Sequence, residues 1–213
     1  MLMTESGNSH SINTFSAKEA SFQSSFGAWR QKVFAPLLKA FDAANISPDA
    51  LSVCGIVVML LLPLGFVYTP LWCVAAYVLH LLFDSLDGSL ARYKGTASPR
   101  GAYLDVVVDH SSLVVTVLTL QWFGFGIPFW VLLYTICYLV LIVHFVLMNT
   151  RGNPPTFPVI RTKYFLFLLA VLVAYNILNV AWLDYFFMLI GTYYTAMVVI
   201  YIVLFRWSLP SQH

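Results

Sequence analysis

Residues 71 to 122 read LWCVAAYVLHLLFDSLDGSLARYKGTASPRGAYLDVVVDHSSLVVTVLTLQW, two apolar stretches on either side of a short polar loop. Each stretch approaches the length of about 20 residues that a helix needs to cross a hydrocarbon core about 30 Å thick. More stretches of this kind flank the pair, so the chain is predicted to form six transmembrane helices. They cover residues 49 to 68, 71 to 92, 102 to 122, 127 to 149, 164 to 182 and 184 to 206.

The composition indicates a membrane protein. Of the 213 residues, 60% are hydrophobic and 9% are charged, and the mean hydropathy is +0.82. Soluble domains contain about 25% charged residues, and the helices expected here lack the polar face that a soluble bundle needs. The period-two alternation of a transmembrane barrel is absent. The predicted fold class is therefore an all-α integral membrane protein.

Polar and amphipathic segments flank the six-helix region. The segment that precedes the first span mixes apolar side chains with Arg30, Lys32 and Lys39, which predicts an amphipathic helix lying on an anionic membrane surface. The predicted organisation is a polar, disordered tail at 1–26, this interfacial helix at 27–45, a six-helix domain at 46–206 and a tail at 207–213.

The basic residues predict how the spans are oriented. When the six spans are threaded through a bilayer, all 11 Lys and Arg residues fall on one side. The positive-inside rule makes that side cytoplasmic. We therefore expect both termini and the active site to face the cytoplasm, in the inner membrane of a bacterium. Membrane lipids are then the surroundings of the bundle, and no nucleic-acid partner is expected.

Four of the nine acidic residues lie close together in the sequence, namely Asp84, Asp87, Asp105 and Asp109. An aspartate at the bilayer centre costs about 3 kcal/mol on insertion scales, and less near the interface, so the group requires a compensating partner. With a rotation of about 100° per residue, each pair projects from one face of its helix. The short loop makes the two helices antiparallel, which brings the pairs opposite one another at the same depth.

These carboxylates predict a metal centre. Oxygen ligands without His or Cys favour Mg²⁺ or Mn²⁺ over Zn²⁺, and two ions can share four carboxylates. Two ions about 3.5–4 Å apart suit a displacement at phosphorus, because they neutralise a pyrophosphate and stabilise the leaving oxygen. Asp109 lies one turn deeper than Asp105 on the same face, so it is the candidate proton acceptor for an attacking hydroxyl.

Small residues and an arginine accompany the acidic residues. Gly88 and Ala91 leave room beside the second span for a flat base or a phosphate, and Gly101 does the same at the start of the third span. Arg92 ends the second span and is placed to bind a phosphate through its planar guanidinium group.

Residues 84 to 109 read DSLDGSLARYKGTASPRGAYLDVVVD, which resembles the signature of the CDP-alcohol phosphotransferase family, D-x2-D-G-x2-A-R-x8-G-x3-D-x3-D. All eight fixed positions and every spacing match. The resemblance covers roughly residues 30 to 206. It implies a class I CDP-alcohol phosphatidyltransferase, an enzyme that moves a phosphatidyl-type group from a CDP-lipid such as CDP-diacylglycerol to an alcohol and releases CMP. Members of the family are commonly homodimers.

The resemblance also implies roles for individual residues. Asp84 and Asp105 would bridge both metal ions, Asp87 would bind one, and Asp109 would be both a ligand and the proton acceptor. The family also contacts its donor through the start of the first span and through Ser98. The predicted donor-binding residues are Asp49, Ser52, Gly88, Ala91, Arg92, Ser98 and Gly101.

The acceptor is less constrained by the sequence. The chain has some likeness to phosphatidylinositol phosphate synthases, whose first span often begins with a segment similar to SPD at residues 47–49, but they usually carry Arg after the fourth Asp, where this chain has His110. Phosphatidylglycerophosphate synthases tend to read LDPxADK where this chain reads LDVVVDH. Arg151, Arg161 and Lys163 either form an acceptor-phosphate pocket with His110 or contact lipid headgroups and set the topology. The favoured acceptor is inositol phosphate or glycerol phosphate. Serine as acceptor, or CDP-choline or CDP-ethanolamine with diacylglycerol, stays open.

Other interpretations of the acidic cluster also stay open. It is alternatively a structural salt-bridge network or part of a cation transporter, although transporters tend to place such acids near the midplane. A membrane prenyltransferase would also bind Mg²⁺, but it should show two separated acidic motifs. His80 and His144 are either packed structural residues or cavity residues, and Lys39 is a further candidate for the acceptor phosphate.

Overall fold

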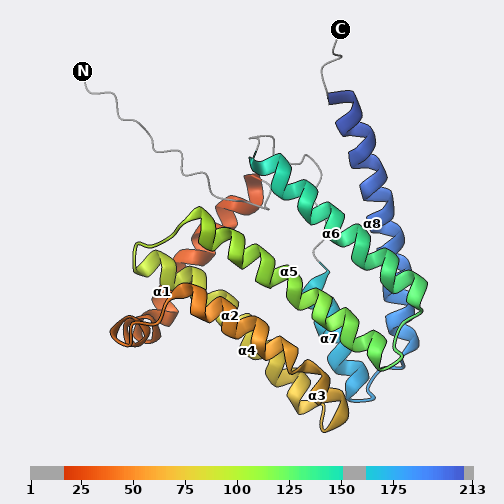
Figure 1. Cartoon of the computed structure of the whole chain (residues 1–213), viewed down its shortest axis with the longest axis horizontal. Coiled ribbons are helices and arrows are strands. Elements are labelled where there is room, and N and C mark those ends of the chain that lie inside the picture. Colours follow the sequence, from red (N-terminus) through yellow and green to blue (C-terminus); the bar gives the residue numbers. More distant parts are fainter. Residues whose placement is uncertain (1–16, 151–161, 209–213) are drawn as a thin grey trace.

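The computed structural model describes residues 17–150 and 162–208, and the regular structure in these two ranges is helical (Figure 1). The helices are α1 Ala17–Ala43, α2 Pro48–Leu60, α3 Leu62–Val67, α4 Leu71–Tyr93, α5 Pro99–Trp122, α6 Pro128–Thr150, α7 Lys163–Ala174 and α8 Ala181–Ser208. The all-α architecture expected from the sequence is therefore confirmed for the described residues.

Five helical segments in the described ranges are long and apolar enough to cross a membrane. The first consists of α2 and α3 together, and the others are α4, α5, α6 and α8. The predicted fifth span, residues 164 to 182, is instead the 12-residue helix α7. An integral membrane protein is thus confirmed, whereas a sixth full-length span is not.

Helix α7 ends early because the chain turns at Asn176, whose φ of 55° lies in the left-handed region. The amides of Asn176 and Ile177 donate to the carbonyls of Val173 and Leu172, both at 2.9 Å. This is the hydrogen-bond pattern of a Schellman motif, in which asparagine can replace the usual glycine. The apolar residues that follow therefore do not continue the helix.

The same motif ends α4 and sets the geometry of the loop that leads to α5. Gly95 has a φ of 67°, its amide donates to the Arg92 carbonyl at 3.2 Å, and the Thr96 amide donates to the Ala91 carbonyl at 2.9 Å. The chain then reverses, and Ser98 caps α5 by accepting from the Gly101 amide at 3.1 Å. As a result, the C-terminal end of α4 and the N-terminal end of α5 meet.

The first span is broken between α2 and α3. Pro63 has no amide hydrogen, and in a regular helix its ring would clash with the carbonyl of the residue four positions earlier. The helix is therefore interrupted before Pro63 and restarts as α3. Gly65 in α3 lets this segment approach α4 closely, because a Cβ atom at Gly65 would lie 2.3 Å from Cys73 Sγ. The start of the span is capped by Ser47, which accepts from the Ala50 amide at 3.1 Å.

The helices pack in two groups that α7 and the contact between α5 and α6 connect (Figure 1). Helix α2 packs against α4 and α5, α6 packs against α8, and α7 contacts α4, α5 and α8. Tyr134, Tyr194 and Phe187 are the largest fully buried side chains of the main core. Large apolar side chains are also exposed on the spanning helices, as expected for surfaces that face lipid.

Helix α1 begins at Ala17, whereas the sequence predicted an interfacial helix from residue 27. Its last part packs on α2 and α4 through a small core that contains Leu38, Leu51 and Leu86. Its position on a membrane surface stays a prediction. Most of the predicted tails, residues 1–16 and 209–213, lie outside the described residues.

Candidate functional site

A cavity of about 570 Å³ opens where the starts of α2 and α5 meet the end of α4. All seven residues that the sequence predicted as donor contacts lie on its wall, together with Asp87 and Asp105. Eight further lining residues were not singled out from the sequence as site residues. They are Asn45, Ser47, Pro48, Lys94, Thr96, Ala97, Arg100 and Ala102.

The buried carboxylate of Asp87 is held by two hydrogen bonds. Ser52 Oγ donates to Oδ2 at 2.5 Å, and the Gly88 amide donates to Oδ1 at 2.5 Å. Ser52 lies one turn into α2, so this bond fixes α2 against α4 at the wall of the cavity. Hydrogen bonds to a charged acceptor are stronger than those between neutral groups, so they fix the orientation of the carboxylate.

Arg92 lies along α4 next to the cavity. Its Nη2 atom is 3.5 Å from Ser89 Oγ, and a Cβ atom at Gly88 would lie 3.5 Å from Arg92 Nη1. The missing side chain at Gly88 therefore leaves the guanidinium group accessible from the cavity. The opposite wall is the N-terminal end of α5, whose free amides and helix dipole favour an anion.

A lysine fixes the loop between α1 and α2 at the edge of the cavity. Lys94 Nζ donates to the Ile46 carbonyl at 2.9 Å and lies 3.3 Å from Asp42 Oδ1. These contacts join segments that are far apart in the sequence, so no local pattern could have identified them. They bring the start of α2, with Asp49 and Ser52, to the same place as the end of α4.

The four predicted metal ligands lie within electrostatic reach of one another. Asp105 is exposed at the cavity wall, and the charges of Asp84, Asp87 and Asp109 all act on it. Asp84 is half-buried and also lies within the electrostatic reach of Asp87 and Asp109. Antiparallel packing of α4 and α5 thus places the two pairs within electrostatic reach of one another, and their convergence on shared metal ions stays a prediction.

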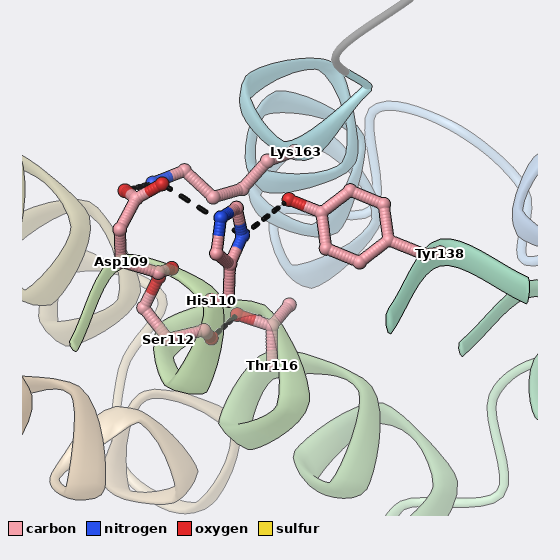
Figure 2. Close-up of polar contacts among 6 residues, drawn as sticks. All are labelled: Asp109, His110, Ser112, Thr116, Tyr138 and Lys163. Atoms are coloured by element: carbon pink, nitrogen blue, oxygen red, sulfur yellow. Dashed lines mark hydrogen bonds and ion pairs between the residues drawn. The ribbon is translucent and has the colours of Figure 1, made fainter. Parts of the chain in front are cut away.

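Asp109 faces the N-terminal end of α7. Lys163, the first residue of α7, donates a hydrogen bond from Nζ to Asp109 Oδ1 (Figure 2). The lysine is buried, with 2% of its surface exposed. His110 Nδ1 lies 3.9 Å from the other carboxylate oxygen of Asp109 and 2.8 Å from the Tyr138 hydroxyl. The ion pair between Lys163 and Asp109 was not predicted, although each of the two was predicted separately as a candidate site residue.

The donor set has the chemistry of a Mg²⁺ or Mn²⁺ site, because it consists of carboxylate oxygens alone. In the part of the chain that the structure describes, however, no three Asp, Glu, His or Cys side chains form a preassembled set of metal ligands. The contacts above explain this: Asp87 is turned toward Ser52 and Gly88, and Asp109 is turned toward Lys163. Coordination of such ions by these carboxylates would require these side chains to rotate.

The other predicted acceptor residues and the remaining candidates lie in several separate parts of the chain. Arg151 and Arg161 lie outside the described residues. His80 is fully buried, and within the described structure neither of its ring nitrogens has a hydrogen-bond partner. His144 is half-buried, with its ring centroid 4.9 Å from that of Tyr201, and Lys39 is exposed on α1.

Comparison with known proteins agrees with this geometry. A family model described as CDP-alcohol phosphatidyltransferase matches residues 45–205. The phosphatidylinositol phosphate synthase of Mycobacteroides abscessus is 31% identical over 103 residues, 45% of this chain and 46% of that protein. The protein of the same name from Cutibacterium acnes is 34% identical over 89 residues, 39% and 42% of the two chains.

An uncharacterized protein of Aquifex aeolicus is 33% identical over 129 residues, which are 58% of this chain and 63% of that protein. The matched segments thus span about half the length of these curated relatives. No solved structure matches the chain significantly.

Proposed function

This chain belongs to the CDP-alcohol phosphatidyltransferase family, and we propose that it transfers a phosphatidyl-type group from CDP-diacylglycerol, or a related CDP-lipid, to an alcohol and releases CMP. The observation that supports this most strongly is the cavity between α2, α4 and α5. The seven predicted donor contacts, which come from three separate segments, all line it beside Asp87 and Asp105.

The cavity suits the nucleotide end of such a donor. Its volume of about 570 Å³ lies within the range of about 300–1,000 Å³ that is usual for small-ligand sites. Arg92, Arg100 and the N-terminal end of α5 supply positive charge for the pyrophosphate. The lipid chains would extend toward the apolar outer surface of α2 and α5.

Two divalent cations, Mg²⁺ or Mn²⁺, are part of the proposal, with Asp84, Asp87, Asp105 and Asp109 as their ligands. When bound, the ions would neutralise the pyrophosphate and stabilise the leaving oxygen. The protein contributes the carboxylates from two facing helices, and Ser52 holds one of them in position. Arg92, on α4 beyond Gly88, binds a donor phosphate in the same cavity.

In the proposed reaction, the acceptor hydroxyl oxygen attacks the lipid-linked β-phosphorus. A new phosphorus–oxygen bond forms, the bond between the β-phosphorus and the bridging oxygen breaks, and the electron pair leaves with CMP. Asp109 accepts the hydroxyl proton. Asp109 lies next to the cavity wall formed by Asp105 and is only partly exposed, with 22% of its side-chain surface accessible, so bulk water competes poorly for the proton.

A phosphorylated polyol is the acceptor that we favour. Lys163 places a positive charge beside Asp109, which suits an anionic acceptor whose hydroxyl must reach that carboxylate. Two of the relatives are named phosphatidylinositol phosphate synthase, which favours inositol phosphate over glycerol phosphate. Arg151, Arg161 and His110 are the other proposed contacts of the acceptor phosphate.

We also propose that the active site and both termini face the cytoplasm, that the membrane is the inner membrane of a bacterium, and that the protein is a homodimer. The distribution of all 11 basic residues on one side of the spans supports the orientation. The homodimer is supported by the resemblance to the family.

The experiment that tests the proposed function is CMP release by the purified protein with CDP-diacylglycerol and Mg²⁺. Inositol phosphate, glycerol phosphate, inositol, serine and glycerol are offered one at a time. We expect turnover with a phosphorylated polyol and none after chelation of the metal. If no alcohol supports CMP release while CDP-diacylglycerol binds, the proposed transferase activity is wrong. Turnover with serine would retain the reaction and correct the acceptor.

A further inference from the structure

We infer that Lys163 is a displaceable counter-ion of Asp109. In this inference the lysine neutralises the carboxylate while no divalent cation is bound, and its ammonium group moves away when a cation coordinates Asp109. The inference rests on the proposed function, because it concerns the same metal site, and it assigns to Lys163 a positioning role that links cation binding to the acceptor side of the site.

The first observation is where Lys163 lies. It is the first residue of α7, which is where a cation at a membrane surface is normally solvated, yet 2% of its surface is exposed. Its Nζ atom donates to Asp109 Oδ1 and lies 4.8 Å from the ring centroid of Tyr164. A buried ammonium group is strongly unfavourable without such a partner. The carboxylate and the lysine therefore depend on one another in this conformation.

The second observation is that the charge of Lys163 acts on most of the acidic cluster. It lies within electrostatic reach of Asp84 and Asp105 as well as of Asp109. Neighbouring carboxylates repel one another, and a single positive charge among them lowers that repulsion. Lys163 thus supplies part of the positive charge that the divalent cations would supply to offset the repulsion between the carboxylates.

The third observation is that the backbone of α7 is fixed at this point, whereas the lysine side chain is long. The preceding residue, Thr162, is buried, and its Oγ1 atom lies 3.1 Å from the Tyr134 hydroxyl and 2.7 Å from the Tyr194 hydroxyl. These contacts hold the first turn of α7 against α6 and α8. Release of Asp109 therefore requires rotation of the Lys163 side chain rather than movement of the helix.

Pairing and coordination at Asp109 compete with one another. The ammonium group occupies an acceptor position of Oδ1, and Mg²⁺ coordinates oxygen at about 2.1 Å. A cation there would place two positive charges side by side in a poorly solvated space. Once released, the ammonium group is close to the place where the acceptor must approach Asp109, so an anionic acceptor would stabilise the released position.

The test is the affinity for Mn²⁺, measured by electron paramagnetic resonance on the purified protein in lipid nanodiscs without substrates. Lys163→Met should bind Mn²⁺ about tenfold more tightly than the wild type, because the competing charge is gone. Lys163→Arg keeps the charge and should stay within about threefold of the wild type. Lys32→Met, which removes an exposed lysine of α1, is the matched control and should not change the affinity.

One measurement on the wild type keeps the inference falsifiable if Lys163→Met folds poorly, and two others test it in the folded variant. In wild-type protein, acylation of Lys163 by an amine-reactive reagent, followed by mass spectrometry, should increase several-fold when Mn²⁺ replaces EDTA. In EDTA, Lys163→Met should melt at a lower temperature than the wild type, and Mn²⁺ should close most of that gap. In an Asp109→Asn background, Lys163→Met should no longer tighten Mn²⁺ binding.

Unchanged or weaker Mn²⁺ binding by folded Lys163→Met would overturn the inference, as would acylation of Lys163 that does not respond to Mn²⁺. Neither measurement requires turnover. If Mn²⁺ binding tightens in Lys163→Met but no alcohol supports CMP release, the counter-ion role stands and the proposed function fails. If CMP is released but Mn²⁺ binding is unaffected by Lys163→Met, the proposed function stands and the counter-ion role fails.

Discussion

The hydrogen bond from Ser52 to Asp87 gives the most quantitative prediction for the site. Both residues are buried, and Ser52 Oγ lies 2.5 Å from Asp87 Oδ2. A hydrogen bond to a charged group contributes about 1.5–3 kcal/mol. In Ser52→Ala the carboxylate keeps the Gly88 amide but loses its bond to α2, so it becomes free to rotate away from the cavity. At about 1.4 kcal/mol per factor of ten, kcat/KM should fall about tenfold to a hundredfold.

The assay is CMP release at varied CDP-diacylglycerol and saturating acceptor, repeated at several Mg²⁺ concentrations. High Mg²⁺ should restore part of the lost activity, because cation binding itself orients the carboxylate. Thr135→Val is the control, since its hydroxyl bonds only a carbonyl of its own helix among the described contacts, Val131 at 2.7 Å. A folded Ser52→Ala protein with kcat/KM within threefold of the wild type would refute the role that we assign to this hydrogen bond.

Three other predictions concern packing, the base and the metal. Gly65→Ala should lower the stability by about 1–3 kcal/mol, seen as a lower Tm, because its Cβ atom would lie 2.3 Å from Cys73 Sγ; an unchanged Tm would contradict the close approach of α3 and α4. Asp109→Asn should abolish CMP release while sparing CDP-diacylglycerol binding more than Asp84→Asn does, and equal losses of binding would count against Asp109 as the base. EDTA should stop turnover and either Mg²⁺ or Mn²⁺ should restore it; full activity in EDTA would exclude the metal from the mechanism.

The parts of the fold that follow from local sequence were predictable. Long apolar runs identified five spans, because a bilayer demands both length and hydrophobicity. The cap of the first span by Ser47 also follows from local sequence, because a serine side chain before a proline can accept from a free amide of the helix start. The sequence also contains a signal for the early end of α7, which the prediction of a span over residues 164 to 182 overlooked. Asn176 can adopt a left-handed conformation and end a helix even within an apolar run.

Contacts that depend on tertiary packing could not be predicted. The wall of the cavity follows from the signature, but the bond between Ser52 and Asp87 joins residues 35 positions apart. Lys163 and Asp109 are 54 positions apart, and hydropathy treats such a lysine as a surface residue. Its burial accompanies two features of the fold: α7 is short, and buried hydroxyl groups hold its first turn. Neither property is visible in the periodicity of the sequence.

The most direct test of the central claim is a crystal structure of the protein with Mn²⁺ and CDP-diacylglycerol, with anomalous differences recorded at the manganese edge. We predict two anomalous peaks about 3.5–4 Å apart, bounded by Asp84, Asp87, Asp105 and Asp109, with the donor pyrophosphate beside them. Peaks at other residues, or the absence of any peak while the Lys163 pair with Asp109 persists, would contradict the account.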